Sequence, residues 1–126
     1  MPSHSLRTLE AAALVGVGGF AGANLRYAVA LLAPGLPGTL AVNAAGSLAL
    51  GFLVYEAAGR GVLADESRTV LATGFLSSLT TYSTFAVQTA GVAPALMAAN
   101  VAANYLLGFL GVVAGRWLAV TYGGGR

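Results

Sequence analysis

Cysteine and lysine are absent from this chain of 126 residues, and histidine occurs once, as His4. Without cysteine the chain can form no disulfide, thiolate nucleophile or cysteine-based metal site. Charged side chains make up only 8% of the residues, whereas soluble domains carry roughly 25%. The positive charges are arginines scattered singly along the chain, so we expect no nucleic-acid partner. No nucleophile–base pair or phosphate-binding loop is recognisable, so we expect no enzymatic activity.

Hydrophobic residues instead make up 57% of the chain, and the mean hydropathy is +0.80. Four apolar stretches are each long enough to cross roughly 30 Å of hydrocarbon as a helix. They cover about residues 9–32, 38–58, 70–90 and 94–120. Turn-forming or charged segments separate them. The sequence therefore predicts an all-α, multi-pass protein of the cell membrane, with residues 1–126 forming a single four-helix transmembrane domain.

The first apolar stretch has a rival interpretation as a cleaved signal peptide. Arg7 would supply its positive n-region, and Ala21-Gly22-Ala23 resembles a small-residue cleavage site. The apolar run continues past that site, which favours a membrane helix.

The third stretch contains an unusually polar run, Ser77-Ser78-Leu79-Thr80-Thr81-Tyr82-Ser83-Thr84-Phe85. Consecutive serines and threonines compete for backbone groups and loosen a helix, so we expect the third helix to break near its middle. Irregular backbone at membrane depth survives only where it is buried in protein or lines a cavity, and its freed carbonyls can coordinate a small cation. Tyr82 and Phe85 lie three residues apart on one helical face. Their positively polarised ring edges could face an anion, although ordinary packing is the alternative.

Other polar side chains in the apolar stretches leave two interpretations open. Arg26 could anchor the first helix at the headgroups or attract an anion into a vestibule. Amides and hydroxyls at i, i+4 spacing could pair with a neighbouring helix or face a pore. These are Thr39, Asn43 and Ser47 in the second helix, and Asn100 and Asn104 in the fourth.

Three motifs in order along the chain resemble the Fluc fluoride channels of the CrcB family. They are Gly19-Phe20-Ala21-Gly22-Ala23-Asn24-Leu25-Arg26-Tyr27, Gly38-Thr39-Leu40-Ala41-Val42-Asn43-Ala44-Ala45-Gly46-Ser47, and the run from Gly74-Phe75 to Thr84-Phe85. The resemblance implies an antiparallel, dual-topology dimer of four-helix subunits with two fluoride pores. Such a channel exports cytoplasmic fluoride passively, driven by the membrane potential, and reduces fluoride toxicity.

The same resemblance implies roles for individual residues. Asn43 would donate a hydrogen bond in the pore, Tyr82 and Phe85 would supply aromatic edges, and Arg26 would stand at the vestibule. The backbone carbonyls of Ser77 and Thr80 would hold a structural sodium ion at the dimer centre. Further pore hydroxyls would come from Thr81, Ser83 and Thr84.

The chain departs from the family pattern at several positions. Tyr82 stands where phenylalanine is usual, Ser77 where glycine is usual, and Gln88 where an acidic residue is common. The fourth helix has no serine or threonine between Asn104 and Arg116. Tyr82 and Ser77 are among the residues to which the resemblance assigns the pores and the sodium site.

Arginines are also distributed unevenly between the two sides of the membrane. All except Arg26 fall on the side of the termini, whereas dual-topology proteins show little such bias. One alternative is therefore a subunit that pairs with an oppositely oriented paralogue and forms a single working pore.

Two other functions are open alternatives. A non-transporting assembly subunit is one of them. A small multidrug exporter is the other, but it needs a mid-membrane carboxylate, and Glu10, Glu56, Asp65 and Glu66 lie at helix ends or in a loop.

Overall fold

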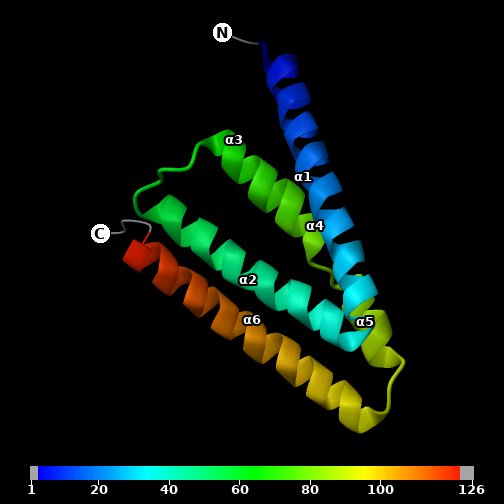
Figure 1. The fold of residues 1–126 in the computed structure, drawn as a ribbon. Coiled ribbons are helices and arrows are strands. Elements are labelled where there is room, and N and C mark those ends of the chain that lie inside the picture. The colour runs from blue at the N-terminus through cyan, green and yellow to red at the C-terminus, as the bar shows by residue number, and fades with distance from the viewer. Residues whose placement is uncertain (1–2, 123–126) are drawn as a thin grey trace.

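The computed structural model describes residues 3–122 of the chain. Within these residues every regular element is helical (Figure 1). The elements are α1 (His4–Leu32), α2 (Leu36–Ala58), α3 (Asp65–Arg68), the π-helix η1 (Thr69–Leu76), α4 (Ser77–Leu79), α5 (Ser83–Ala90) and α6 (Pro94–Tyr122). Four segments of this described part are long and apolar enough to cross a membrane: His4–Leu32, Leu36–Ala58, Asp65–Ala90 and Pro94–Tyr122. The predicted all-α membrane fold with four spanning helices is confirmed.

The third spanning segment is interrupted, as the run of hydroxyl residues predicted. It proceeds from α3 through η1 and α4 to Leu79, and then Thr80 adopts an extended conformation with φ −79° and ψ 157°. Helical structure resumes at Ser83 as α5. The π-helix before the break was not predicted, because its wider turn leaves no distinctive composition. Short π-helical segments are often found at functional sites.

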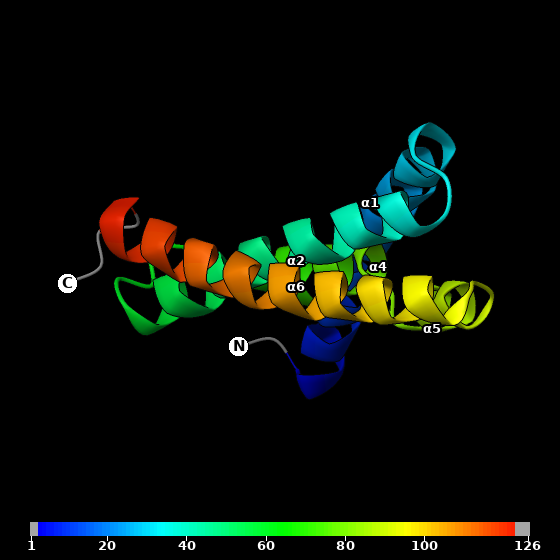
Figure 2. The same ribbon diagram turned by 90° about the horizontal axis from the view of Figure 1, so that it is seen from below.

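Two pairs of packed membrane-spanning segments give the molecule its shape. α6 packs along α2, as both views show (Figures 1 and 2), and α1 packs against η1 and α4 (Figure 1). Glycines allow these close approaches: a Cβ at Gly115 would collide with the Leu48 carbonyl oxygen, and one at Gly22 with that of Phe75. Close backbone contact through small residues is typical of membrane helices.

We expect the replacement Gly115→Ala to lower the thermal unfolding midpoint in detergent, because the added methyl group meets fixed backbone of α2. Overpacking of this kind costs about 1–3 kcal/mol. Gly16→Ala is the matched control, since a Cβ at Gly16 meets nothing within 4 Å. It should leave the midpoint unchanged or raise it slightly, because alanine favours helix. Equal midpoints for the two variants would contradict this account of the α2–α6 contact.

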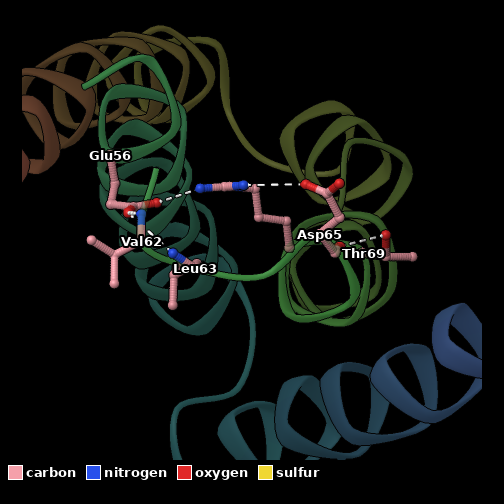
Figure 3. Close-up of polar contacts among 6 residues, drawn as sticks. Glu56, Val62, Leu63, Asp65 and Thr69 are labelled. Atoms are coloured by element: carbon pink, nitrogen blue, oxygen red, sulfur yellow. Dashed lines mark hydrogen bonds and ion pairs between the residues drawn. The ribbon is translucent and has the colours of Figure 1, made fainter. Parts of the chain in front are cut away.

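The connection between α2 and α3 is fixed by one buried carboxylate. Glu56, only 4% exposed, accepts hydrogen bonds from the backbone N–H groups of Val62 (2.5 Å) and Leu63 (3.3 Å) (Figure 3). Its other oxygen pairs with Arg68 at 2.8 Å, and Arg68 also reaches Asp65 at 3.4 Å. Both carboxylate oxygens of Glu56 are thus bonded to the segment that connects α2 and α3 or to Arg68. This carboxylate at the end of α2 is not available as the mid-membrane proton carrier that a multidrug exporter needs.

Candidate functional site

Asn43 on α2 lies opposite the break in the third helix and pairs with its backbone. The Thr81 N–H donates to Asn43 Oδ1 at 2.8 Å, and Asn43 Nδ2 donates to the Thr81 carbonyl at 2.9 Å. The side-chain amide therefore satisfies both polar groups of a residue that has left the helix. One of the two N–H bonds of Nδ2 is used in this pair, and a second remains as a donor. The role of Asn43 as a pore donor stays a prediction.

Two backbone carbonyls at the break have lost the N–H donors that they would have in a helix. In an α-helix the carbonyl of residue i accepts from the N–H of residue i+4. The Thr81 N–H goes to Asn43 and leaves Ser77 without its donor, while the Thr84 N–H goes to Thr81 Oγ1 at 3.1 Å and leaves Thr80 without its donor. Among residues 3–122, no other group donates to the Ser77 or Thr80 carbonyl. These are the two carbonyls to which the family resemblance assigns a sodium ion.

The residues with freed carbonyls line a surface hollow of about 400 Å³, together with Asn43, Gly46 and Tyr82. Carbonyl oxygens of unwound membrane helices are suitable ligands for sodium. The donor set therefore fits the ion in chemical type. Two carbonyls are too few to replace a hydration shell, so a bound sodium ion would need further ligands from outside this pair.

Arg26 on α1 is tied to the third helix, whereas an anchor at the headgroups would point away from it. Its Nε donates to the Ser78 carbonyl at 3.0 Å. Arg26 also lines a second hollow, of about 300 Å³, with Thr39, Thr84 and Gln88. There Thr39 Oγ1 donates to Gln88 Oε1 at 2.7 Å. Gln88 is neutral, and no carboxylate lies among the described residues that line this hollow. The Arg26 guanidinium therefore gives the hollow a positive potential.

A third, smaller cavity lies at the aromatic residues. It has a volume of about 190 Å³ and is lined by Asn43, Tyr82, Phe85, Asn104 and Tyr105. The Tyr82 and Phe85 ring centroids are 5.8 Å apart with an interplanar angle of 48°. Phe85 is buried at 9% exposure, whereas Tyr82 is 73% exposed. The Phe85 ring is therefore packed within the chain, whereas the Tyr82 ring presents its surface outward.

The structure brings most of the predicted site residues together. Thr81 lines the first two hollows and Thr84 the second. Ser83, in contrast, lines none of these three spaces, although its Oγ lies 3.4 Å from Thr81 Oγ1. Sequence reasoning left the role of Asn104 open and missed Tyr105, for which the only signal was its position next to Asn104.

The chain is similar to known proteins along almost its whole length. The family described as "CrcB-like protein, Camphor Resistance (CrcB)" matches residues 13–116. The chain is 63% identical over 115 residues to "Fluoride-specific ion channel FluC 2" of Halobacterium salinarum, covering 90% of each protein. It is 54% identical over 123 residues to "Fluoride-specific ion channel FluC 1" of Haloarcula marismortui, covering 98% of this chain and 96% of the relative.

Proposed function

Because this chain belongs to the CrcB family, we infer that it is a fluoride-specific ion channel of the cell membrane. The observation that carries this inference is the high identity to fluoride-specific channels over nearly the full length of both chains. The resemblance seen in the three sequence motifs is confirmed. The alternatives of a multidrug exporter and of a half-channel that needs a paralogue are not favoured by the comparisons.

The site suits passive conduction of a small, strongly hydrated anion. Arg26 raises the local anion concentration at its hollow, since a cleft lined by one sign of charge attracts the opposite ion. Hydroxyl and amide donors can replace part of the hydration shell of fluoride, and aromatic ring edges can face it without binding it tightly. The membrane potential supplies about 2.3 kcal/mol per charge per 100 mV, which drives the anion out of the cell.

We propose further that two copies of this chain assemble in inverted orientation. Many large apolar side chains of α1 and α6 are exposed in one subunit, including Phe20 at 74% and Phe109 at 72%. Lipid can cover such surfaces, but it cannot complete a hollow lined by free carbonyls. A second subunit can supply both the missing cation ligands and a partner for the exposed ring of Tyr82.

The deciding experiment is fluoride efflux from liposomes that contain the purified chain alone, with chloride as the comparison ion. Rapid efflux of fluoride and negligible efflux of chloride are expected. Size-exclusion chromatography with light scattering should report a dimer before reconstitution. No fluoride efflux from folded, dimeric protein would overturn the channel assignment for this chain acting by itself.

We expect sodium to stabilise the dimer, because the Ser77 and Thr80 carbonyls have lost their helical donors. An ion that binds only the folded dimer raises the thermal midpoint as its concentration rises. Midpoints should therefore increase from N-methylglucamine chloride to sodium chloride at equal ionic strength. Potassium should stabilise less if the bound cation must fit closely. Identical midpoints in all three salts would contradict a sodium site at these carbonyls.

A further inference from the structure

The third spanning segment changes its hydrogen-bond pattern immediately before the break. The Ser77 N–H donates to the Ala72 carbonyl, five residues back, as in a π-helix. The Thr80 N–H then donates to the Leu76 carbonyl at 3.0 Å, four residues back, as in an α-helix. The pattern therefore shortens by one residue between Ser77 and Thr80.

This change leaves one backbone carbonyl without an N–H donor. The N–H groups of Ser78 and Leu79 belong to α4, where the partners four residues back are the carbonyls of Gly74 and Phe75. The Thr73 carbonyl is therefore left over. The hydroxyl of the preceding serine, Ser77, donates to it and also approaches the Gly74 carbonyl at a longer distance of 3.3 Å. The side chain thus supplies the donor that the backbone lacks at this point.

Thr69, at the other end of η1, uses its hydroxyl differently. Its Oγ1 donates to the Asp65 carbonyl at 3.0 Å, and its backbone N–H donates to the same carbonyl. Removal of the Thr69 hydroxyl would leave that carbonyl with a donor, whereas removal of the Ser77 hydroxyl would leave the Thr73 carbonyl with none. Hydrocarbon offers no water as a replacement.

The π-helix sets the rotation of the break relative to the part of the segment that packs on α1. A Cβ at Gly18 of α1 would collide with the Val70 carbonyl oxygen and lie 3.0 Å from the Gly74 Cα, so η1 is closely fitted there. Beyond the break, Thr81 pairs with Asn43 on α2. The segment contacts both of these helices (Figure 1). A π-helix has more residues in each turn than an α-helix, so a return of η1 to α-helix would rotate Thr81 away from Asn43.

We propose that Ser77 is a positioning residue for the fluoride pathway, because its hydroxyl stabilises the end of the π-helix. With the Thr73 carbonyl satisfied, the π-helix ends at a fixed residue, and Thr81 is presented to Asn43. Without the hydroxyl, the Thr73 carbonyl recovers a donor only if the Ser77 N–H leaves Ala72 and bonds to it instead. That exchange shortens the π-helix and rotates the break. This inference rests on the proposed channel function.

Selective labelling reports both ends of this mechanism in one NMR spectrum. Thr73-Gly74 is the only Thr-Gly pair and Thr80-Thr81 the only Thr-Thr pair in the sequence. Protein labelled with ¹³C-carbonyl, ¹⁵N threonine and ¹⁵N glycine therefore gives one amide–carbonyl cross-peak for each pair. The first contains the Thr73 carbonyl carbon, and the second contains the Thr81 N–H, which donates to Asn43.

Ser77→Ala should move the Thr73 carbonyl signal, because this carbonyl loses its hydroxyl donor. The Thr81 N–H should exchange with solvent about fivefold to tenfold faster, as expected for one lost hydrogen bond. Ser77→Thr keeps the hydroxyl and should restore both signals, and its added methyl group has room beside the hollow of about 400 Å³. Thr69→Val is the matched control and should change neither signal, since the Asp65 carbonyl keeps its N–H donor.

Each NMR outcome decides a separate part of the proposal. An unmoved Thr73 signal in Ser77→Ala would overturn the hydroxyl bond and the proposal with it. A moved Thr73 signal with unchanged Thr81 exchange would overturn the positioning role. If Ser77→Ala does not fold, Ser77→Cys replaces the hydroxyl by a weaker donor and should change both signals in the same direction by less.

Fluoride efflux from liposomes tests the consequence for conduction. Ser77→Ala should reduce efflux per folded dimer about fivefold to tenfold, the same factor as for Thr81 exchange, and Ser77→Thr should restore it. Equal efflux from Ser77→Ala and the unaltered protein would overturn the role in the pathway. If the unaltered protein conducts no fluoride, the channel assignment fails, while the two NMR signals still decide whether Ser77 holds the break in place.

Discussion

Fluoride efflux is expected to fall about 100-fold when Asn43 is replaced by leucine, because two partly buried hydrogen bonds of roughly 1.4 kcal/mol each are lost. Leucine has the same number of side-chain heavy atoms as asparagine and the same branch at Cγ, so it fits the place of the amide on α2 most closely among the apolar residues. The Thr81 N–H and carbonyl lose their bonds of 2.8 Å and 2.9 Å. Thr81 can then return its N–H to Ser77 and close the break. Efflux of fluoride from liposomes, measured per folded dimer, reports this loss.

Asn24→Leu is the control for the Asn43 variant. Asn24 is also a helical asparagine, but it is exposed and its amide donates only to the Phe20 carbonyl one turn back. Its replacement should change efflux less than about twofold, as is usual for surface positions. The interpretation is wrong if Asn43→Leu conducts normally, or if Asn24→Leu is equally impaired. Thr81 amide exchange with solvent gives a second readout, because the Asn43→Leu variant should lose protection there.

The break in the third helix could be predicted from the sequence because its cause is local. Consecutive hydroxyl side chains weaken the helix wherever they occur. The partner that stabilises the broken backbone could not be predicted in this way. Asn43 is 38 residues away from Thr81, and one sequence gives no information on which helix an amide faces. Asn43 pairs with the broken third segment and also lines the hollow, and its role in a pore stays a prediction.

Other outcomes follow the same division between local and long-range causes. The cap of α1 is local: Ser3 accepts from the Leu6 N–H at 3.3 Å, and the helix begins at His4, ahead of the predicted start near residue 9. The pairing of Glu56 with Arg68 depends on how a loop folds back, so the sequence placed Glu56 only at a helix end. The Asn100 amide donates to Thr89 in another helix, which i, i+4 spacing cannot indicate.

Arg26 is the position where charge should matter most, and Arg26→Gln is expected to reduce fluoride efflux about tenfold at low ionic strength. The substitution removes the guanidinium from the hollow of about 300 Å³. It also removes the bond of 3.0 Å from Nε to the Ser78 carbonyl, so two causes must be separated. Arg26→Lys keeps the positive charge without the planar, five-donor group. If attraction of the anion dominates, the lysine variant should conduct nearly as well as the unaltered protein.

Ionic strength provides an independent separation of the two causes. The Debye length falls from about 30 Å at 0.01 M salt to about 3 Å at 1 M, so an attractive charge at an entrance loses its effect. The deficit of Arg26→Gln should therefore shrink as salt is raised, whereas a deficit caused by the lost carbonyl bond should persist. Arg60→Gln is the matched control, because Arg60 is an exposed arginine in the connection after α2. A salt-independent deficit shared by Arg26→Gln and Arg26→Lys would mean that Arg26 acts by holding the third helix at Ser78, and that fluoride enters without electrostatic attraction from this residue.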